Sequence, residues 1–334
     1  MLVGIVVALV AGGVLYQQIA TRYYRRRRPP PGEFVRVGRH RLHAHCDGAG
    51  SPLVLLEAGI AASSLSWSLV QQQIAEFTRV CAYDRAGLAW SDRASLPRTF
   101  EGIVNELAQL LTHVAPDDQY VLVGHSFGSF VIRSYAERHP EKVVGLVLVD
   151  PPTEWLTMTP RRDRMLRRAQ RLSRVGAVLA HIGVVRASLA LLTGGAPGAP
   201  RRFVSVLGPA ALHTLQRLVG EVKKLPSDVH PVVQELWCQP KCFHAMAEHL
   251  GVLRREGKAL AALNPPPGIP VVVISSGNQP AEQIAEHRAL AARSTTARHV
   301  IAARSTHWVQ FDEPDLVVAA VKEVVESLRP PLPA

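Results

Sequence analysis

Short apolar runs alternate along this chain with longer segments whose apolar positions recur every three or four residues. An unbroken apolar run is typical of a strand buried on both faces of a parallel sheet, and the three-to-four spacing is typical of an amphipathic helix. The alternation therefore predicts an α/β fold with a mostly parallel central sheet flanked by helices. The predicted strands are 33–37, 41–46, 53–57, 79–83, 120–124, 143–149, 270–275 and 297–302. The predicted helices are 67–76, 100–114, 128–138, 281–293 and 314–328.

The alternation stops between the predicted strands 143–149 and 270–275. The intervening stretch is helix-like, and segments rich in Gly and Pro interrupt it at 194–200 and 265–267. A long insertion at one point of an α/β sheet usually covers the side that carries the functional site. We therefore predict that 151–268 forms a helical cap.

We expect residues 29–150 and 269–334 to form the α/β core that this cap covers. A separate N-terminal segment, 1–28, precedes the core. Residues 2–16 are continuously apolar, and five arginines fall within 22–28. A helix over 2–20 just reaches the ~20 residues that cross the hydrocarbon core of a bilayer. A secretory signal carries its positive charge before the apolar run. We therefore favour an uncleaved transmembrane anchor over a cleaved signal or a helix lying on the membrane surface.

Positive flanks stay on the cytoplasmic side of a membrane. We therefore expect a single-pass protein of the cell membrane whose main domain faces the cytoplasm. Four cysteines in a chain of 334 residues exclude a disulfide scaffold, and no paired CxxC repeat suggests a structural zinc.

The formal net charge of +11 is local rather than general. Beside the five arginines in 22–28, seven more fall in 161–174, and without these twelve and Asp163 there remain 26 basic and 26 acidic residues. Two basic patches on a balanced protein fit contact with an anionic membrane surface. Aromatic residues make up only 6% of the chain, too few for a platform on which single strands stack, so we expect no nucleic-acid partner.

The second basic patch has helical periodicity. Such a basic helix can lie on anionic lipid, or it can be a solvated helix that covers the core, and the pattern leaves both open. The apolar and small residues at three- and four-residue spacing are Met165, Ala169, Leu172, Gly176 and Leu179.

The most informative motif is Gly124-His125-Ser126-Phe127-Gly128, which joins the predicted strand 120–124 to a predicted helix. Two glycines let strand and helix approach closely, so that Ser126 lies on a strained turn with its hydroxyl exposed. This context favours Ser126 as a nucleophile. We interpret His125 as a packing or hydrogen-bonding residue.

A serine nucleophile needs a base, and the base needs a carboxylate that orients it. His307 lies just past the last predicted strand, at the carboxyl edge of the sheet, where a histidine can reach the serine. Asp150 follows the strand 143–149 and lies at the same edge. We therefore predict His307 as the base and Asp150 as the orienting acid.

Two backbone amides are candidates for an oxyanion hole. The Phe127 amide lies at the start of a helix, where amides are free to donate. The Ile60 amide follows Gly59 in the loop after the strand 53–57, where a backbone N–H can face the serine.

Together these residues resemble the α/β-hydrolase fold superfamily, and more narrowly the bacterial α/β hydrolases with an N-terminal membrane segment. The resemblance covers 33–150 and 268–328, and the cap is matched only in its placement. It implies Ser126 as nucleophile, His307 as base, and Phe127 with Ile60 as oxyanion donors. It implies no metal and no organic cofactor. The motifs that carry it are Glu57-Ala58-Gly59, Tyr83-Asp84-Arg85-Ala86-Gly87, the serine motif, and Ser305-Thr306-His307.

The chain departs from the family in the position of the acid. Many members carry it after the penultimate strand, and the corresponding loop here, 275–282, contains no aspartate. Other members place it after the strand that here ends in Asp150, and the order Ser126, Asp150, His307 matches the order of the family. The departure strengthens Asp150 and leaves Glu282 as the alternative acid.

A second family motif has a structural interpretation. In Tyr83-Asp84-Arg85 we expect an Asp84–Arg85 pair that holds the loop before Ser91.

These expectations combine into a membrane-anchored serine hydrolase that cleaves a carboxylic ester, small or lipid-like, through an acyl-enzyme. Acyl transfer to an acceptor other than water and cofactor-free perhydrolysis can use the same residues. A non-catalytic, membrane-tethered binding module is the alternative from another class. The cap decides which ester is used, and neither that ester nor the oligomeric state follows from the sequence.

Overall fold

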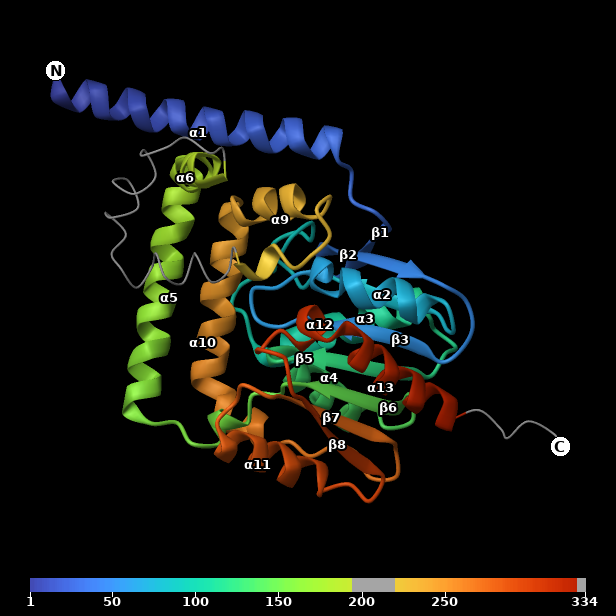
Figure 1. The fold of residues 1–334 in the computed structure, drawn as a ribbon. Helices are drawn as coiled ribbons and strands as arrows, with labels where there is room; N and C mark the ends of the chain where they lie inside the picture. Colours follow the sequence, from blue (N-terminus) through green and yellow to red (C-terminus); the bar gives the residue numbers. More distant parts are fainter. Residues whose placement is uncertain (194–219, 329–334) are drawn as a thin grey trace.

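A computed structural model of the protein describes residues 1–193 and 220–328, and its centre is one eight-stranded sheet (Figure 1). The strand order is β1-β2-β4-β3-β5-β6-β7-β8. The pairs β1–β2 and β2–β4 are antiparallel, and all the others are parallel. Every predicted strand is present, with its ends within one residue of the prediction. The strands are β1 (Glu33–Val37), β2 (His40–Asp47), β3 (Leu53–Glu57), β4 (Val80–Tyr83), β5 (Tyr120–His125), β6 (Val143–Val149), β7 (Val271–Ser276) and β8 (Ala297–Ala302).

Helices cover both faces of the sheet, which explains the unbroken apolar runs. In β3, Leu53 and Leu55 point into a core shared with α3, α4 and α11, while Val54 and Leu56 point into a core shared with α2 and α13. The helices of the two layers are α2 (Ser68–Ala75), α3 (Phe100–Val114), α4 (Phe127–Arg138), α11 (Ala281–Ala291) and α13 (Pro314–Ser327). Short helical turns are η1 (Ser64–Trp67), η2 (Thr153–Leu156) and α12 (Val309–Asp312).

Among the described residues, four further α-helices follow β6 and precede β7, and we call them the cap helices. Figure 1 shows α5 and α10 side by side at one end of the sheet, with α6 and α9 beside them. The predicted Gly- and Pro-rich interruption at 194–200 lies outside the described residues. The cap helices are α5 (Pro160–His181), α6 (Val184–Thr193), α9 (His230–Trp237) and α10 (Pro240–Ala262).

The expected apolar stripe on α5 is wrong in part. Met165 and Leu172 are exposed, and the buried face, which packs on α10, consists of Leu166, Ser173, Ala177 and Ala180. Small residues allow two helices to approach closely, so the packed face of α5 consists largely of Ala and Ser, while Met165 and Leu172 lie among the exposed arginines. Spacing alone therefore placed two of the five stripe residues on the wrong side of this helix.

The N-terminal helix α1 (Leu2–Arg27) is longer than the predicted apolar segment and continues through the arginines. It is long and apolar enough to cross a membrane, a property that a signal sequence shares. Only 6% of its most apolar window is buried, so α1 is not a core helix of the protein.

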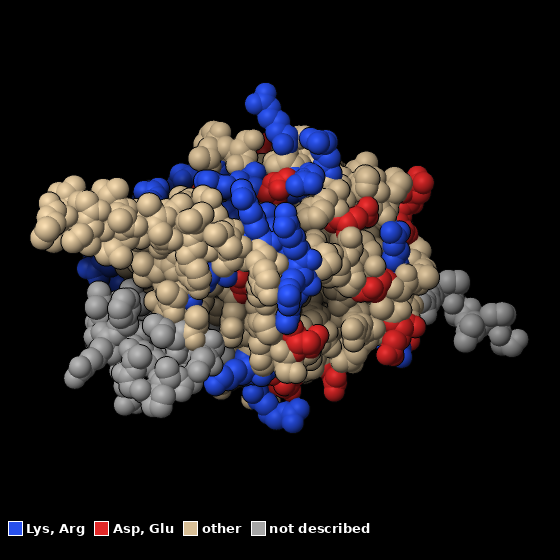
Figure 2. Space-filling model, turned by 90° about the horizontal axis from the view of Figure 1, so that it is seen from above, with Lys and Arg blue, Asp and Glu red and all other residues tan. Residues whose placement is uncertain are grey.

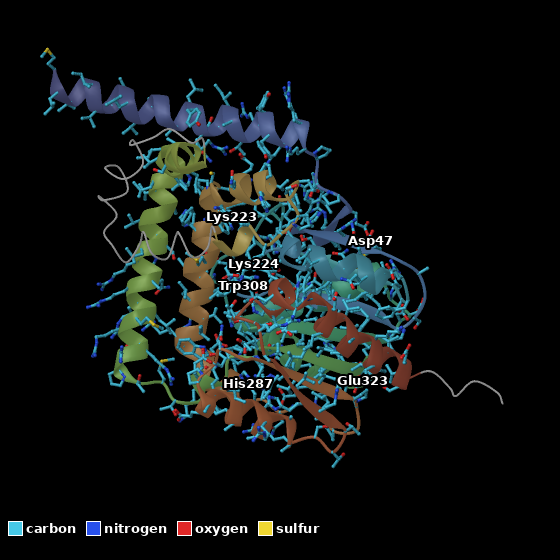
Figure 3. The ribbon with its side chains drawn as sticks, in the orientation of Figure 1. Asp47, Lys223, Lys224, His287, Trp308 and Glu323 are labelled. Atoms are coloured by element: carbon cyan, nitrogen blue, oxygen red, sulfur yellow. A yellow bond between two sulfur atoms is a disulfide. The ribbon has the colours of Figure 1, made fainter. Side chains whose placement is uncertain are left out.

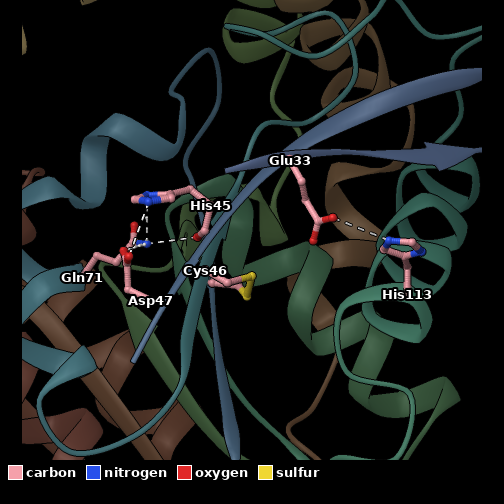
Figure 4. Close-up of a disulfide and its surroundings, with 7 residues drawn as sticks. Glu33, His45, Cys46, Asp47, Gln71 and His113 are labelled. Carbon is pink, nitrogen blue, oxygen red and sulfur yellow. Dashed lines mark hydrogen bonds and ion pairs between the residues drawn. A yellow bond between two sulfur atoms is a disulfide. The ribbon is translucent and has the colours of Figure 1, made fainter. Parts of the chain in front are cut away.

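A disulfide joins Cys46 on β2 to Cys81 on β4 (Figure 4). The two cysteines are direct partners in the antiparallel register, which brings their Cα atoms to 4.0 Å. Sequence spacing gives no sign of this pair, because strand register alone brings the two residues together. The other two cysteines, Cys238 and Cys242, are free.

Candidate active site

Ser126 occupies a sharp turn between β5 and α4. Its φ of 50° and ψ of −121° lie in a region that L-residues rarely adopt, and its amide donates to the Val149 carbonyl at 2.9 Å. A Cβ atom on Gly124 would lie 2.8 Å from the backbone carbon of Gly128, and one on Gly128 would lie 2.5 Å from the Glu57 carbonyl oxygen. Both glycines are therefore required by the close approach of strand and helix that the motif predicts.

His307 and Asp150 are joined by a hydrogen bond of 2.7 Å between Nδ1 and Oδ2. Asp150 directly follows β6, and its side chain is fully buried. The Ser276 amide (3.0 Å) and the Gln279 side chain (2.7 Å) also donate to this carboxylate. Burial alone would raise the pKa of Asp150, but the hydrogen bonds from His307, Ser276 and Gln279 hold the pKa below its ordinary value. Asp150 is thus an ionised carboxylate that fixes the histidine ring.

The alternative acid, Glu282, lies exposed in the first turn of α11. Within the described residues no hydrogen bond or ion pair joins it to His307. Gln279, from the same loop, contacts Asp150 instead. The loop after β7, which carries the acid in many family members, therefore holds the Asp150 carboxylate in place instead.

His125 ties the histidine loop to the serine turn. Its Nε2 donates to the backbone carbonyl of His307 at 2.8 Å, and the two rings lie 4.7 Å apart between centroids. Burial, with a contribution from the neighbouring His307, lowers the pKa of His125 to about 3, so the ring stays neutral. The structure records no hydrogen bond between the Ser126 hydroxyl and His307 in the part of the chain it describes. The ring of His307 is 43% exposed and lies on the loop that His125 holds.

The loop after β3 lies against the serine turn. A Cβ atom on Gly59 would lie 2.8 Å from Nδ1 of His125 and 3.5 Å from the Ser126 Cβ. Among the described hydrogen bonds, none uses the amide of Ile60 or of Phe127 as a donor. Phe127 is the first residue of α4, where backbone amides have no partner within the helix. Both amides are therefore unused among the described hydrogen bonds, and they belong to the residues that follow Gly59 and Ser126.

The expected Asp84–Arg85 pair is absent from the described interactions, and this prediction is wrong. Neighbouring residues at a strand end point to opposite sides. The Asp84 carboxylate lies 2.9 Å from Nδ1 of His43 and accepts hydrogen bonds from the backbone amides of Ser64 and Trp90. It therefore holds the loop before Ser91 without Arg85.

Arg85 instead supports the loop beside the serine. It pairs with Glu57 and donates to the backbone carbonyls of Ala58 and Gly59. Tyr83 donates to the same Glu57 carboxylate. The charged side chains of Arg85 and Glu57 are almost fully buried. All these residues belong to the family motifs of the sequence. The sequence does not show in which direction each side chain points.

A further buried group lies behind Asp150. His287 on α11 is fully buried, and its Nε2 donates to the Pro151 carbonyl at 2.6 Å, while its Nδ1 lies 2.8 Å from the Ser275 hydroxyl. Burial lowers the pKa of His287, so it binds as a neutral ring. Figure 3 shows His287 on the lower side of the sheet and Trp308, next to the candidate base, nearer its centre. No sequence pattern indicated His287.

This arrangement has the parts of a nucleophilic site. A buried carboxylate on Nδ1 fixes the histidine tautomer that leaves Nε2 free to accept a proton. A serine hydroxyl and two unused amides lie on the neighbouring loops.

A family model described as "alpha/beta hydrolase fold" matches residues 52–171. A probable transporter, efuK, of Hormonema carpetanum is 34% identical, over 36% of this chain and 18% of its own length. An AB hydrolase superfamily protein of Gibberella zeae is 26% identical over 83% of this chain and 87% of its own length. A haloalkane dehalogenase of Sphingobium indicum is 27% identical over 89% of this chain and 96% of its own.

Solved structures show the same fold. An esterase of Thermogutta terrifontis superposes with a TM-score of 0.63 at 17% identity, covering 89% of this chain and 99% of the other. The epoxide hydrolase CorEH superposes with a TM-score of 0.64 at 18% identity, with the same coverage. Ester, epoxide and carbon–halogen hydrolases thus all occur among the proteins similar to this chain, which supports a hydrolase without selecting the bond.

Proposed function

The chain belongs to the α/β-hydrolase superfamily, and on that premise we propose that it is a serine hydrolase that cleaves a carboxylic ester. The observation that carries the proposal is the 2.7 Å bond between His307 and the buried Asp150, on a loop that His125 holds beside the Ser126 turn. A histidine held in this way is the base that a serine nucleophile needs.

In the proposed mechanism the Ser126 hydroxyl attacks the ester carbonyl while Nε2 of His307 takes its proton. The amides of Ile60 and Phe127 stabilise the negative oxygen of the tetrahedral intermediate. The intermediate collapses to an acyl-enzyme, and His307 gives its proton to the departing alkoxide, which leaves as an alcohol. Water, activated by the same histidine, then releases the acid and restores Ser126. Asp150 stays ionised and stabilises the imidazolium that forms in each step.

The residue at the turn favours an ester over the other bonds that similar proteins cleave. Attack by a serine oxygen on a halide or an epoxide would form an ether, which has no carbonyl for water to attack. Attack on an ester forms an acyl-serine, which water can cleave. Ser126 therefore supports acyl chemistry rather than displacement at a saturated carbon.

Intact-mass measurement after treatment with a fluorophosphonate tests the proposal. We expect one label per wild-type chain, no label on Ser126→Ala, and an unchanged label on Ser327→Ala, which removes a serine far from the site. A panel of p-nitrophenyl esters should show turnover that Ser126→Ala loses. A folded wild-type protein that takes no label, or whose ester turnover survives in Ser126→Ala, would refute the proposal and favour a binding module.

A further inference from the structure

The second half of α1 docks on the cap helices through polar side chains. Gln17 is 5% exposed, donates to the backbone oxygen of Cys238 at 2.9 Å, and accepts from Nε of Arg186 at 2.8 Å. Arg186 also donates to the Thr21 hydroxyl at 3.0 Å and pairs with Glu235 on α9. Since charged groups are costly in hydrocarbon, this cluster indicates that the docked side of α1 lies outside the lipid.

The backbones of α1 and the cap also touch. A Cβ atom on Gly13 would collide with the carbonyl oxygen of Ile182, and one on Gly183 would lie 2.9 Å from the Gly13 oxygen. Close crossing at small residues is a common way for helices to pack. From Gly13 onward, α1 is therefore a packed part of the cap.

The opposite side of the same half is apolar and exposed. Leu15, Ile19 and Tyr23 form one stripe along the helix, and Tyr16, whose ring also lies against Gly183, borders it. Each of the four is at least 47% exposed. A helix on the surface of a water-soluble protein has the reverse arrangement, with its apolar side on the protein. A contiguous exposed apolar surface marks an interaction site, and here that surface runs along the side of α1.

Basic residues flank this stripe. Arg22 lies just before its last residue, Tyr23, and Arg25 to Arg28 follow it along the helix. The guanidinium of Arg27 lies over the Tyr23 ring, 4.8 Å from its centroid. Figure 2 shows Lys and Arg side chains gathered beside one end of the uncharged α1 surface. Positive charge beside an apolar, tyrosine-bearing stripe complements an anionic bilayer. A second copy of this chain would bring like charges together.

The free part of α1 is too short to cross a bilayer. Residues 2–12 are exposed and project beyond the described cap helices, and at 1.5 Å per residue they extend about 16 Å. The hydrocarbon core is about 30 Å thick. If α1 stood across the membrane, its docked half would remain outside, and the stripe at Leu15, Ile19 and Tyr23 would face water.

We propose that α1 is a fixed part of the cap and binds along one leaflet of an anionic membrane, without crossing it. The stripe faces the acyl chains, the arginines contact anionic headgroups, and the cluster around Arg186 stays on the protein side. Both ends of α1 then lie on the same side of the bilayer as the rest of the protein. This arrangement differs from the single-pass anchor expected from the sequence.

Labelling of the N-terminus tests the topology. The full-length Leu2→Cys variant is bound to sealed vesicles of phosphatidylcholine and phosphatidylglycerol and treated with a membrane-impermeant maleimide from outside. We expect labelling beyond that of the wild-type protein, whose own cysteines are the background control. Labelling that requires rupture of the vesicles would place the N-terminus in the lumen and overturn the proposal.

A matched pair of variants tests the surface. Ile19→Glu should reduce vesicle binding at least tenfold, whereas Ile301→Glu, at an exposed isoleucine on the distant β8, should leave it unchanged. Binding that is equal for Ile19→Glu and wild type would overturn the proposal. Efficient cross-linking of two Ile19→Cys chains on vesicles would assign the stripe to a second copy instead.

Discussion

The bond between His307 and Asp150 joins an exposed ring to a fully buried carboxylate. The ring of His307 is 43% exposed, whereas the side chain of Asp150 is inaccessible to water. The carboxylate is therefore held by fixed donors, while the other side of the ring remains open to a substrate.

Asp150→Asn should lower kcat by about 10³- to 10⁴-fold, because an amide can hold the histidine in the wrong tautomer. Esterase kinetics on protein of unchanged circular dichroism measure this. Glu282→Gln serves as the control and should change kcat less than about twofold. A large loss in Glu282→Gln with little change in Asp150→Asn would assign the acid to the other loop.

Acid should destabilise the fold through His125. Its pKa of about 3 lies below that of an unfolded histidine, about 6.5. Between these values the unfolded chain holds a proton that the folded protein does not, so the free energy of unfolding falls as the pH decreases from about 6.5 towards 3. Above that window the contribution is constant.

Urea unfolding at about pH 7 and about pH 4 compares wild type with His125→Gln, whose side-chain amide lies near the position of Nε2 and can donate to the His307 carbonyl. We expect the variant to lose less stability on acidification, by a few kcal/mol. His113→Asn, at an exposed histidine, should behave as wild type. An identical pH dependence in His125→Gln would show that this histidine is not the cause.

Arg85→Met should destabilise the protein by about 3–5 kcal/mol, because it leaves the buried Glu57 without its charged partner. The matched control is Arg298→Met, which removes an exposed pair with Glu323 (Figure 3) and should cost about 0–1 kcal/mol. Thermal and urea unfolding measure both. Equal effects of the two substitutions would mean that Arg85 has no special role under the Ala58–Gly59 loop.

Gly128→Ala should cost about 1–3 kcal/mol or more, since its new Cβ would meet the Glu57 carbonyl oxygen at 2.5 Å. Gly220→Ala places a methyl group in open space and is the control. Urea denaturation compares them. If Gly128→Ala were as stable as Gly220→Ala, the close approach of α4 to β3 would be disproved.

The Cys46–Cys81 disulfide is evidence about which side of a membrane the main domain faces. Disulfides persist in oxidising compartments and are rare in the cytosol, which opposes the cytoplasmic location expected from the arginines. We predict that alkylation of the unfolded, unreduced protein modifies only Cys238 and Cys242, and that reduction exposes two more thiols. Intact mass of protein isolated under acid quench measures this. Four modified cysteines without reduction would favour the cytoplasm.

Much of the fold follows from local pattern. The strands are apolar runs whose ends the flanking polar residues mark, so all eight were predictable. Ser126, Asp150 and His307 each follow a strand, and the edge of a parallel sheet gathers such positions. Their placement therefore needed no knowledge of packing.

The missing parts depend on side-chain direction and on neighbours distant in sequence. Arg85 and Asp84 are adjacent in the chain, yet they serve different loops. Gln279 and His287 contribute to the site only because β7 and α11 pack beside β6. For α1, composition indicates an apolar helix but not which side the protein covers.

The chain leaves β6 and returns at β7, and these strands are hydrogen-bonded neighbours, with the Asp150 amide 2.7 Å from the Ile274 carbonyl oxygen. The cap helices therefore enter and leave the sheet at nearly one point. A segment inserted in this way can be lengthened, shortened or exchanged without altering any other strand pairing. The roles that we propose for the cap helices and α1, in substrate preference and membrane contact, can thus diverge among relatives while the chemistry of the sheet edge stays the same.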